Sequence, residues 1–222
     1  MNEFLGIIQH ELHLAALAFM GSAYVLRIIW LLNFSAGRER SLPAGQPAGA
    51  VVSSLLAVAK PWTREGSSRN PVFYAQFVLF HLGAAAAISL TYFIPYRPEL
   101  LKYELFVRTL QIILGAAFVV GLLRLYRRLA DPSLRMISTP DDYFALIMMT
   151  AFYAAAIGAV SVNSLMMGNG PLLVFFLMAA CFHFYVPFSK IIHYLYYPFT
   201  RYYLGKAMGH RNIGNGYISG LS

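Results

Sequence analysis

Apolar residues are gathered into long runs along this chain, and most polar residues fall between those runs. A run of about 20 apolar residues is long enough for an α-helix to cross the hydrocarbon core of a membrane. Five runs reach this length, at residues 12–34, 72–96, 105–125, 143–165 and 171–197. The pattern predicts an all-α integral membrane protein with a single domain over residues 1–222, built as a five-helix transmembrane bundle.

The connection between the first two runs contains a shorter apolar segment. The stretch GRERSLPAGQPAG is punctuated by Gly and Pro, which predicts a loop. Residues 49–60 follow it and are too few to cross a membrane. They predict a helix lying at the membrane surface, with Lys60 and Trp62 at the level of the lipid headgroups. An ordered loop packed on the helix ends is the alternative.

The composition and the distribution of charge agree with a membrane protein. Only 12% of the residues are charged, against about 25% in soluble domains. The formal net charge is +8, and basic residues gather in alternate connections, as the positive-inside rule requires. The rule places the N-terminus outside and the C-terminus in the cytoplasm. This alternation favours a membrane protein over a nucleic-acid-binding one.

Two further features exclude other classes. The first run follows Glu3 and Glu11 and contains Arg27, so it lacks the basic start and short apolar core of a cleavable signal peptide. We expect it to be a retained helix. The single cysteine, Cys181, excludes a disulfide framework and any Cys-ligated zinc or iron–sulfur site formed by this chain alone.

The third connection, RRLADPSLRMISTPDDY, ends in the residues of a helix start. Ser138 or Thr139 can accept hydrogen bonds from N–H groups of a first helical turn, and Pro140 suits its first position. Asp141 and Asp142 favour the positive end of the helix dipole. The fourth helix is therefore expected to begin here, on the cytoplasmic side.

Histidines are the side chains of this sequence best suited to hold a metal or cofactor within the membrane. An isolated histidine can equally serve as a hydrogen-bond partner of a neighbouring helix. His81 lies about ten residues into the second run, and His193 lies near the cytoplasmic end of the fifth. At 1.5 Å per residue, both fall in the cytoplasmic half of the bilayer. Two imidazoles at one depth form a candidate bis-histidine site for a haem iron.

For the other four histidines, the sequence supports less specific predictions. His183 precedes His193 by ten residues, which is about 15 Å and about 80° around a helix, so the two cannot share an iron. Its alternatives are a structural contact, a quinone contact or a ligand to a second haem. His10 and His13 are expected at the outer surface, with His13 at a depth too different from that of His183 for pairing. His210 is expected in solvent.

Two of these histidines lie in motifs that resemble a known family. LFHLG at residues 79–83 and PFSKIIH at residues 187–193 resemble the haem-binding helices of the respiratory nitrate reductase gamma-subunit family. RRLADPSLRMISTPDD resembles the connection between its third and fourth helices, and Arg27 also fits its pattern. The resemblance runs through all five runs. It implies a five-helix membrane cytochrome b, with His81 and His193 as axial ligands of one haem b near the cytoplasmic face.

The departures from the family change the expected haem count. Members with two haems carry further histidines at positions that are Thr91 and Phe175 in this chain. The resemblance therefore implies a single-haem variant, as in transmembrane redox complexes of anaerobes such as the high-molecular-weight cytochrome c complex. Such a subunit of the bacterial inner membrane would carry electrons between a menaquinone pool or a multihaem cytochrome c and a cytoplasmic iron–sulfur protein. It would have no complete active site of its own.

Three cations near the cytoplasmic ends of the runs are candidate partners for haem propionates, because buried carboxylates need charged donors: Lys190, Arg64 and Arg201. The tyrosines of residues 194–203 predict an interfacial belt or the wall of a cofactor pocket. Two rival functions stay open. One is a haem-free structural anchor whose histidines only form hydrogen bonds. The other is a small transporter, which is weaker because paired charges deep in the runs are lacking.

Overall fold

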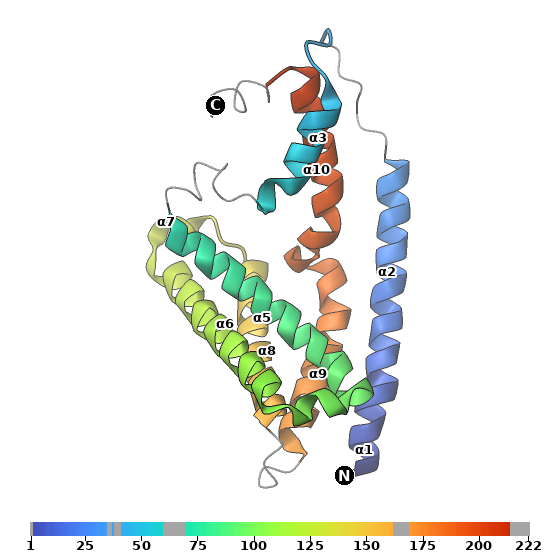
Figure 1. Cartoon of the computed structure of the whole chain (residues 1–222), viewed down its shortest axis with the longest axis vertical. Helices are drawn as coiled ribbons and strands as arrows, with labels where there is room; N and C mark the ends of the chain where they lie inside the picture. Colours follow the sequence, from blue (N-terminus) through green and yellow to red (C-terminus); the bar gives the residue numbers. More distant parts are fainter. Residues whose placement is uncertain (1, 35–36, 38–40, 60–69, 162–168, 214–222) are drawn as a thin grey trace. The chain divides into compact units, whose positions relative to one another are not determined.

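The structure is a computed structural model that describes residues 2–34, 37, 41–59, 70–161 and 169–213. No strand occurs in these ranges, and five helices are long and apolar enough to cross a membrane (Figure 1). They cover Glu3–Asn33, Pro71–Tyr96, Glu104–Ala130, Pro140–Ser161 and Gly170–Phe188. The five-helix membrane architecture predicted from the sequence is therefore confirmed. The outside position of the N-terminus stays a prediction.

The elements follow one another through the chain as helices and short helical turns. In order they are α1 (Asn2–Gly6), the π-helical turn η1 (Ile7–Leu12), α2 (His13–Asn33), α3 (Pro47–Leu55), η2 (Leu56–Val58), α5 (Pro71–Tyr96), η4 (Pro98–Lys102), α6 (Glu104–Ala130), α7 (Pro132–Met136), α8 (Pro140–Ser161), α9 (Gly170–Tyr185), η5 (Val186–Phe188), η6 (Lys190–Ile192) and α10 (His193–His210).

Two boundaries differ most from the sequence-based expectation. Helical structure in the first span begins at Asn2 and runs through η1 into α2, so the span starts earlier than residue 12. The predicted fifth span, 171–197, is interrupted at Ser189, whose backbone is extended at φ −102° and ψ 172°. His193 therefore begins α10 instead of lying inside the fifth crossing.

The chain forms two compact units. The first contains Met1–Ala23 and Ala75–Ile191, and the second contains Tyr24–Tyr74 and Ile192–Ser222. The first unit thus holds most of α5 with all of α6, α8 and α9, and the second holds α3 and α10.

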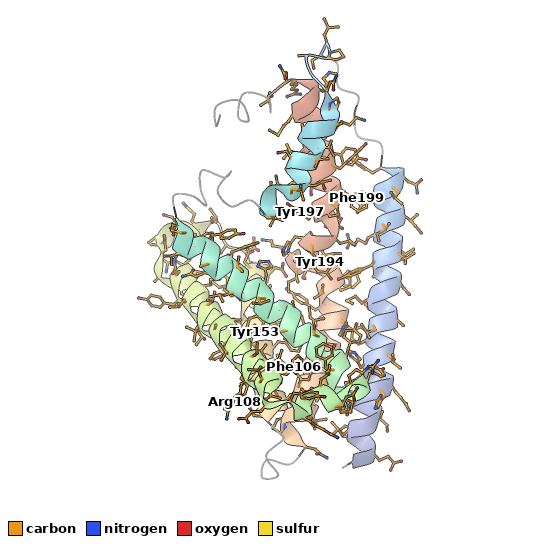
Figure 2. All side chains as sticks on the ribbon, in the orientation of Figure 1. Phe106, Arg108, Tyr153, Tyr194, Tyr197 and Phe199 are labelled. Carbon is orange, nitrogen blue, oxygen red and sulfur yellow. The ribbon has the colours of Figure 1, made fainter. Side chains whose placement is uncertain are left out.

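Small residues let the helices of the first unit approach closely. A Cβ atom added at Gly83 of α5 would overlap Ala117 of α6, and one added at Gly121 of α6 would overlap the side chain of Thr150 of α8. The hydroxyl of Tyr153, on α8, donates to the carbonyl oxygen of Phe80 at 2.8 Å (Figure 2). Small residues at such contacts are typical of helix association in lipid.

An aromatic core fills the space between α8 and α9. The rings of Phe152 and Phe175 are stacked, with centroids 5.3 Å apart. The ring of Phe176 lies edge-on to that of Phe175, and the ring of Phe182 is tilted against that of Phe152. Phe175 and Phe176 are both completely buried.

The predicted start of the fourth helix is confirmed, since α8 begins at Pro140. The role expected for the hydroxyls is wrong. Thr139 Oγ1 donates to the carboxylate of Asp142, and the backbone N–H of Thr139 donates to the same oxygen, each at 2.8 Å. Ser138 Oγ instead donates to the carbonyl of Leu134. The carboxylate three residues into the helix therefore caps its start, because it reaches back to the donors that precede it.

Asp142 also joins α8 to η6, the helical turn that follows Ser189. Its carboxylate accepts from the ammonium of Lys190 at 2.7 Å and lies 3.7 Å from Arg128 of α6. Asp141 accepts from the hydroxyl of Tyr185 and from the backbone N–H of Lys190. The extended backbone at Ser189 is held in place by these bonds.

Replacing Asp142 by alanine is expected to lower the free energy of unfolding by about 2 kcal/mol, because a helix cap and a charge-assisted hydrogen bond are lost together. Asp142→Asn should lose less, since the amide oxygen still accepts from Thr139. Thermal unfolding of the detergent-solubilised chain, followed by helical circular dichroism, measures the difference. Glu99→Ala is the control, because its ion pair with Arg97 is exposed and contributes little. Equal unfolding temperatures for Asp142→Ala and Glu99→Ala would contradict the assignment.

The second unit is built on very close packing of α3 against α10, which lie side by side in Figure 1. A Cβ added at Gly205 would lie 2.6 Å from the Cα of Val51, and one at Gly209 would lie 2.6 Å from the Cα of Pro47. The hydroxyl of Tyr197, labelled in Figure 2, donates to the carbonyl of Leu55 at 3.2 Å.

Residues 47–58 are therefore helical, and they pack on α10. Their placement at the membrane surface stays a prediction. Lys60 and Trp62, which were expected at headgroup level, lie outside the described residues.

Candidate functional site

His81 lies on α5 and its side chain is exposed within the first unit. Its Nδ1 is 2.7 Å from the carbonyl oxygen of Phe77, one helical turn earlier. A carbonyl oxygen can only accept, so Nδ1 carries the proton and the lone pair of the neutral ring is on Nε2. An imidazole oriented in this way by a backbone carbonyl has the form that ligates metals in proteins.

His193 is the first residue of α10 and is exposed within the second unit. Its ring centroid lies 6.4 Å from that of Tyr194, at an interplanar angle of 75°. The hydroxyl of Tyr194 shares a short hydrogen bond with that of Tyr24, and Arg27 donates to the hydroxyl of Tyr196 at 2.8 Å. These contacts hold the first turn of α10 against the C-terminal half of α2.

The two predicted ligands belong to different units, His81 to the first and His193 to the second. The haem shared between them therefore stays a prediction from the sequence. Each side chain is exposed on its own unit.

His13 and His183 form a pair, contrary to the prediction from the sequence. Their ring centroids are 5.1 Å apart at an angle of 79°. His13 is completely buried and His183 is 8% exposed. The expectation that His13 lies at the outer surface, too far in depth from His183, is wrong. That expectation assumed that the first helix starts at residue 12, whereas the helical backbone begins at Asn2.

The two rings of this pair differ in their hydrogen bonding. His183 Nδ1 lies 2.5 Å from the carbonyl oxygen of Ala179, which leaves the lone pair on Nε2. Both ring nitrogens of His13 are buried, and neither has a hydrogen-bond partner among the residues that the structure describes. A buried polar group without a partner costs about 1–3 kcal/mol.

Aromatic rings surround the buried pair. His13 meets Tyr92 and Phe176 edge-on, with ring centroids 5.9 and 6.0 Å away. His10 is exposed and lies edge-on to Tyr96 at 6.0 Å. The pair thus lies in an apolar, aromatic environment between the first helix, α5 and α9.

The three predicted propionate partners differ in the contacts that their side chains make. The ammonium of Lys190 donates to the carboxylate of Asp142 and, at 2.8 Å, to the hydroxyl of Thr139. The guanidinium of Arg201 lies over the ring of Tyr197, 5.4 Å from its centroid. Arg64 lies outside the described residues. His210, expected in solvent, is half-buried with Nε2 2.8 Å from the carbonyl oxygen of Ser41, so that expectation is wrong.

The number of ligating side chains that lie together limits which group they could hold. No group of three or more His, Cys, Asp or Glu side chains able to hold a metal ion occurs in the described ranges. A protein-bound zinc ion usually takes three or four such ligands, whereas a haem iron needs two axial imidazoles at most. His81 and His183 both carry the lone pair on Nε2, as an axial ligand requires.

His13 is the candidate residue that sequence reasoning missed. The signal that would have found it is the apolar content of residues 4–8, which extends the first helix toward the N-terminus and so moves His13 deeper into the membrane.

Comparisons with protein-family models, curated proteins and solved structures found no match to this chain, so the proposals below rest on its residues and their geometry.

Proposed function

We propose that this chain is the haem b-carrying membrane subunit of a respiratory redox complex. In that role it transfers electrons between a quinone pool or a periplasmic cytochrome c and a cytoplasmic iron–sulfur partner. The five membrane-crossing helices support a membrane-embedded carrier. The motifs around His81 and His193, which resemble those of the nitrate reductase gamma-subunit family, supply the haem ligands of the proposal.

The orientation of His81 is the observation that carries the proposal. Its imidazole is exposed on a membrane-crossing helix, although ionisable side chains are costly in hydrocarbon. The Nδ1–H bond to Phe77 orients the ring and directs the lone pair of Nε2 away from the backbone of α5. This arrangement is typical of a metal-ligating histidine.

The proposal assigns a role to each residue of the site. His81 and His193 would bind the haem iron, and the carbonyl of Phe77 would keep His81 in its ligating tautomer. Of the three candidate propionate partners, Arg201 is the one proposed to hold a propionate; its guanidinium lies over the ring of Tyr197. A haem with two axial histidines transfers single electrons and has no open position for oxygen.

Haem quantification in the purified full-length chain tests the proposal. We expect haem b in the wild-type protein, seen as a reduced-minus-oxidised spectrum and counted as the pyridine haemochrome. His81→Ala and His193→Ala should each remove one haem per chain, since an iron with one axial ligand is held weakly. His210→Ala is the matched control, because it removes an imidazole from the opposite end of α10. Wild-type haem content in both ligand variants would refute the proposed ligands.

A haem-free structural anchor is the second candidate. The observation that favours it is the engagement of Lys190 with Asp142, which gives one predicted propionate partner a structural role instead. Purified protein without haem, together with normal assembly of its complex, would support the anchor and refute the electron carrier.

A further inference from the structure

We propose that α3 and α10 form a lipid-binding surface, on which Lys206 and Arg211 bind the phosphate groups of anionic phospholipids. The inference goes beyond the proposed function, because it concerns the second unit alone and holds whether or not the chain carries haem. It also gives a physical reason for the predicted placement of residues 47–58 at the membrane surface.

The first argument is the partition of charge between the two units. The second unit contains nine Lys and Arg residues against two Glu, which gives it a formal charge of +7. The first unit contains eight Lys and Arg residues against seven Asp and Glu, which gives +1. The net charge of the chain, +8, therefore belongs almost entirely to the second unit.

The positive charge continues along α10. Residues 192–222 contain three cations, Arg201, Lys206 and Arg211, and no Asp or Glu. The guanidinium of Arg201 lies over the ring of Tyr197, whereas Lys206 and Arg211 are exposed at the C-terminal end of the helix. These two are five residues apart, which is about 7.5 Å along the helix axis. This end of α10 therefore presents an excess of positive charge.

The second argument is the apolar surface that accompanies these cations. On α3, Val52 and Leu56 are 56% and 46% exposed. On α10, Tyr202 and Leu204 are 46% and 45% exposed. Tyr202 lies four residues before Lys206, so the two are neighbours on the helix surface. Exposed aliphatic and aromatic side chains next to cations are typical of helices that lie at the level of the lipid headgroups.

The third argument is the length and composition of the two helices. Residues 47–58 form an apolar helix that is too short to cross a membrane, and α10 is not among the helices long and apolar enough to do so. His193, the first residue of α10, follows the end of the fifth crossing at Phe188 by five residues. The start of α10 is therefore close to the membrane. Exposed apolar groups and cations are both well solvated at its surface.

The chemistry of the surface favours lipid over other anions. Anionic headgroups give the cytoplasmic leaflet a negative potential, and a Lys or Arg near it strengthens association about 5-fold. The positive-inside rule predicts that this end of the chain is cytoplasmic. An acidic protein surface would match the charge of Lys206 and Arg211, but it gives no reason for the exposure of Val52 and Leu56.

Calorimetric titration of the purified, delipidated full-length chain tests the proposal. The probes are dioctanoyl phosphatidylglycerol, which is anionic, and dioctanoyl phosphatidylcholine, which has the same acyl chains and no net charge. In a neutral detergent at low ionic strength, we expect the anionic lipid to bind about 25-fold more tightly, because two cations contribute. Salt at about 0.5 M should reduce this preference, since it screens exposed charges. Glycerol phosphate, which lacks acyl chains, should bind more weakly than phosphatidylglycerol.

Glutamine variants assign the preference to α10. Lys206→Gln/Arg211→Gln should lose about 25-fold in affinity for phosphatidylglycerol and keep its affinity for phosphatidylcholine. Arg97→Gln/Lys102→Gln is the matched control, because it removes two exposed cations from the first unit and should keep the wild-type preference. Lys206→Arg/Arg211→Lys preserves both charges and should bind as the wild type does, which separates loss of charge from loss of folding.

Each contrary outcome overturns a defined part of the inference. Equal affinity of the wild type for the two lipids would overturn the lipid-binding surface and make an acidic protein surface the better occupant. Equal affinity for phosphatidylglycerol and glycerol phosphate would make free phosphate the ligand. An equal loss in the two glutamine double variants would overturn the assignment to Lys206 and Arg211. None of these measurements depends on haem content, so the proposed function is tested separately.

Discussion

Replacing Gly205 and Gly209 together by valine is expected to detach α3 from α10. Each new Cβ would lie 2.6 Å from a backbone carbon of α3, Val51 Cα at one position and Pro47 Cα at the other. Backbone atoms cannot turn away as a flexible side chain can, so the helices must separate. Overpacking of this kind costs about 1–3 kcal/mol at a site. For the two sites together we expect a loss of about 3 kcal/mol, which corresponds to a factor of about 100.

Hydrogen exchange of the backbone amides of α3 measures this effect. The backbone amides of residues 48–55 should exchange about 100-fold faster in the double variant, because local opening governs their protection. Gly49→Val is the matched control on the same helix, since a Cβ added there meets nothing within 4 Å. It should leave protection of α3 close to that of the wild type.

Unchanged exchange of α3 in the double variant would show that the contact with α10 does not hold this segment. Equal acceleration in Gly49→Val would attribute the effect to valine itself, and would likewise contradict the packing argument.

Truncating Phe175 to alanine is the second change with a large expected effect. The ring is completely buried on α9 and stacks on Phe152 of α8. Unfolded membrane helices stay in lipid, so the cost is the lost packing and the cavity instead of a transfer to water. We expect about 2 kcal/mol, below the 3–5 kcal/mol typical of soluble cores.

The unfolding free energy of the detergent-solubilised chain measures this loss. Phe188→Ala is the control, because that ring is 66% exposed and its truncation leaves no buried cavity. If the two variants were equally stable, the stacked pair would not be part of the core.

The membrane-crossing helices could be predicted from the sequence because a bilayer imposes a length and an apolar composition on every crossing. Their ends were harder to predict. The run beginning at residue 171 stays apolar through Ser189, so hydropathy continues across a break that the backbone makes there. That break depends on Asp141 and Asp142, which lie almost 50 residues earlier in the chain.

Some histidines of the candidate site could likewise be predicted from the sequence, and others could not. His81 and His193 were found because each lies in a recognisable local motif. His13 lies in no motif, and its pairing with His183 depends on the contact between helices that are 170 residues apart. Whether two side chains on separate helices meet depends on the rotation of each helix about its axis and on its depth in the membrane. Hydropathy predicts neither of these to within one helical turn.

The sequence by itself determined that this chain has five segments long and apolar enough to cross a membrane. Solvation is the reason, because a bilayer imposes a length and an apolar composition on every crossing. The tertiary structure alone decided the break before α10, the close approach of α3 to Gly205 and Gly209, and the burial of His13 against His183. Those features depend on contacts between distant segments, which packing selects and local composition does not encode.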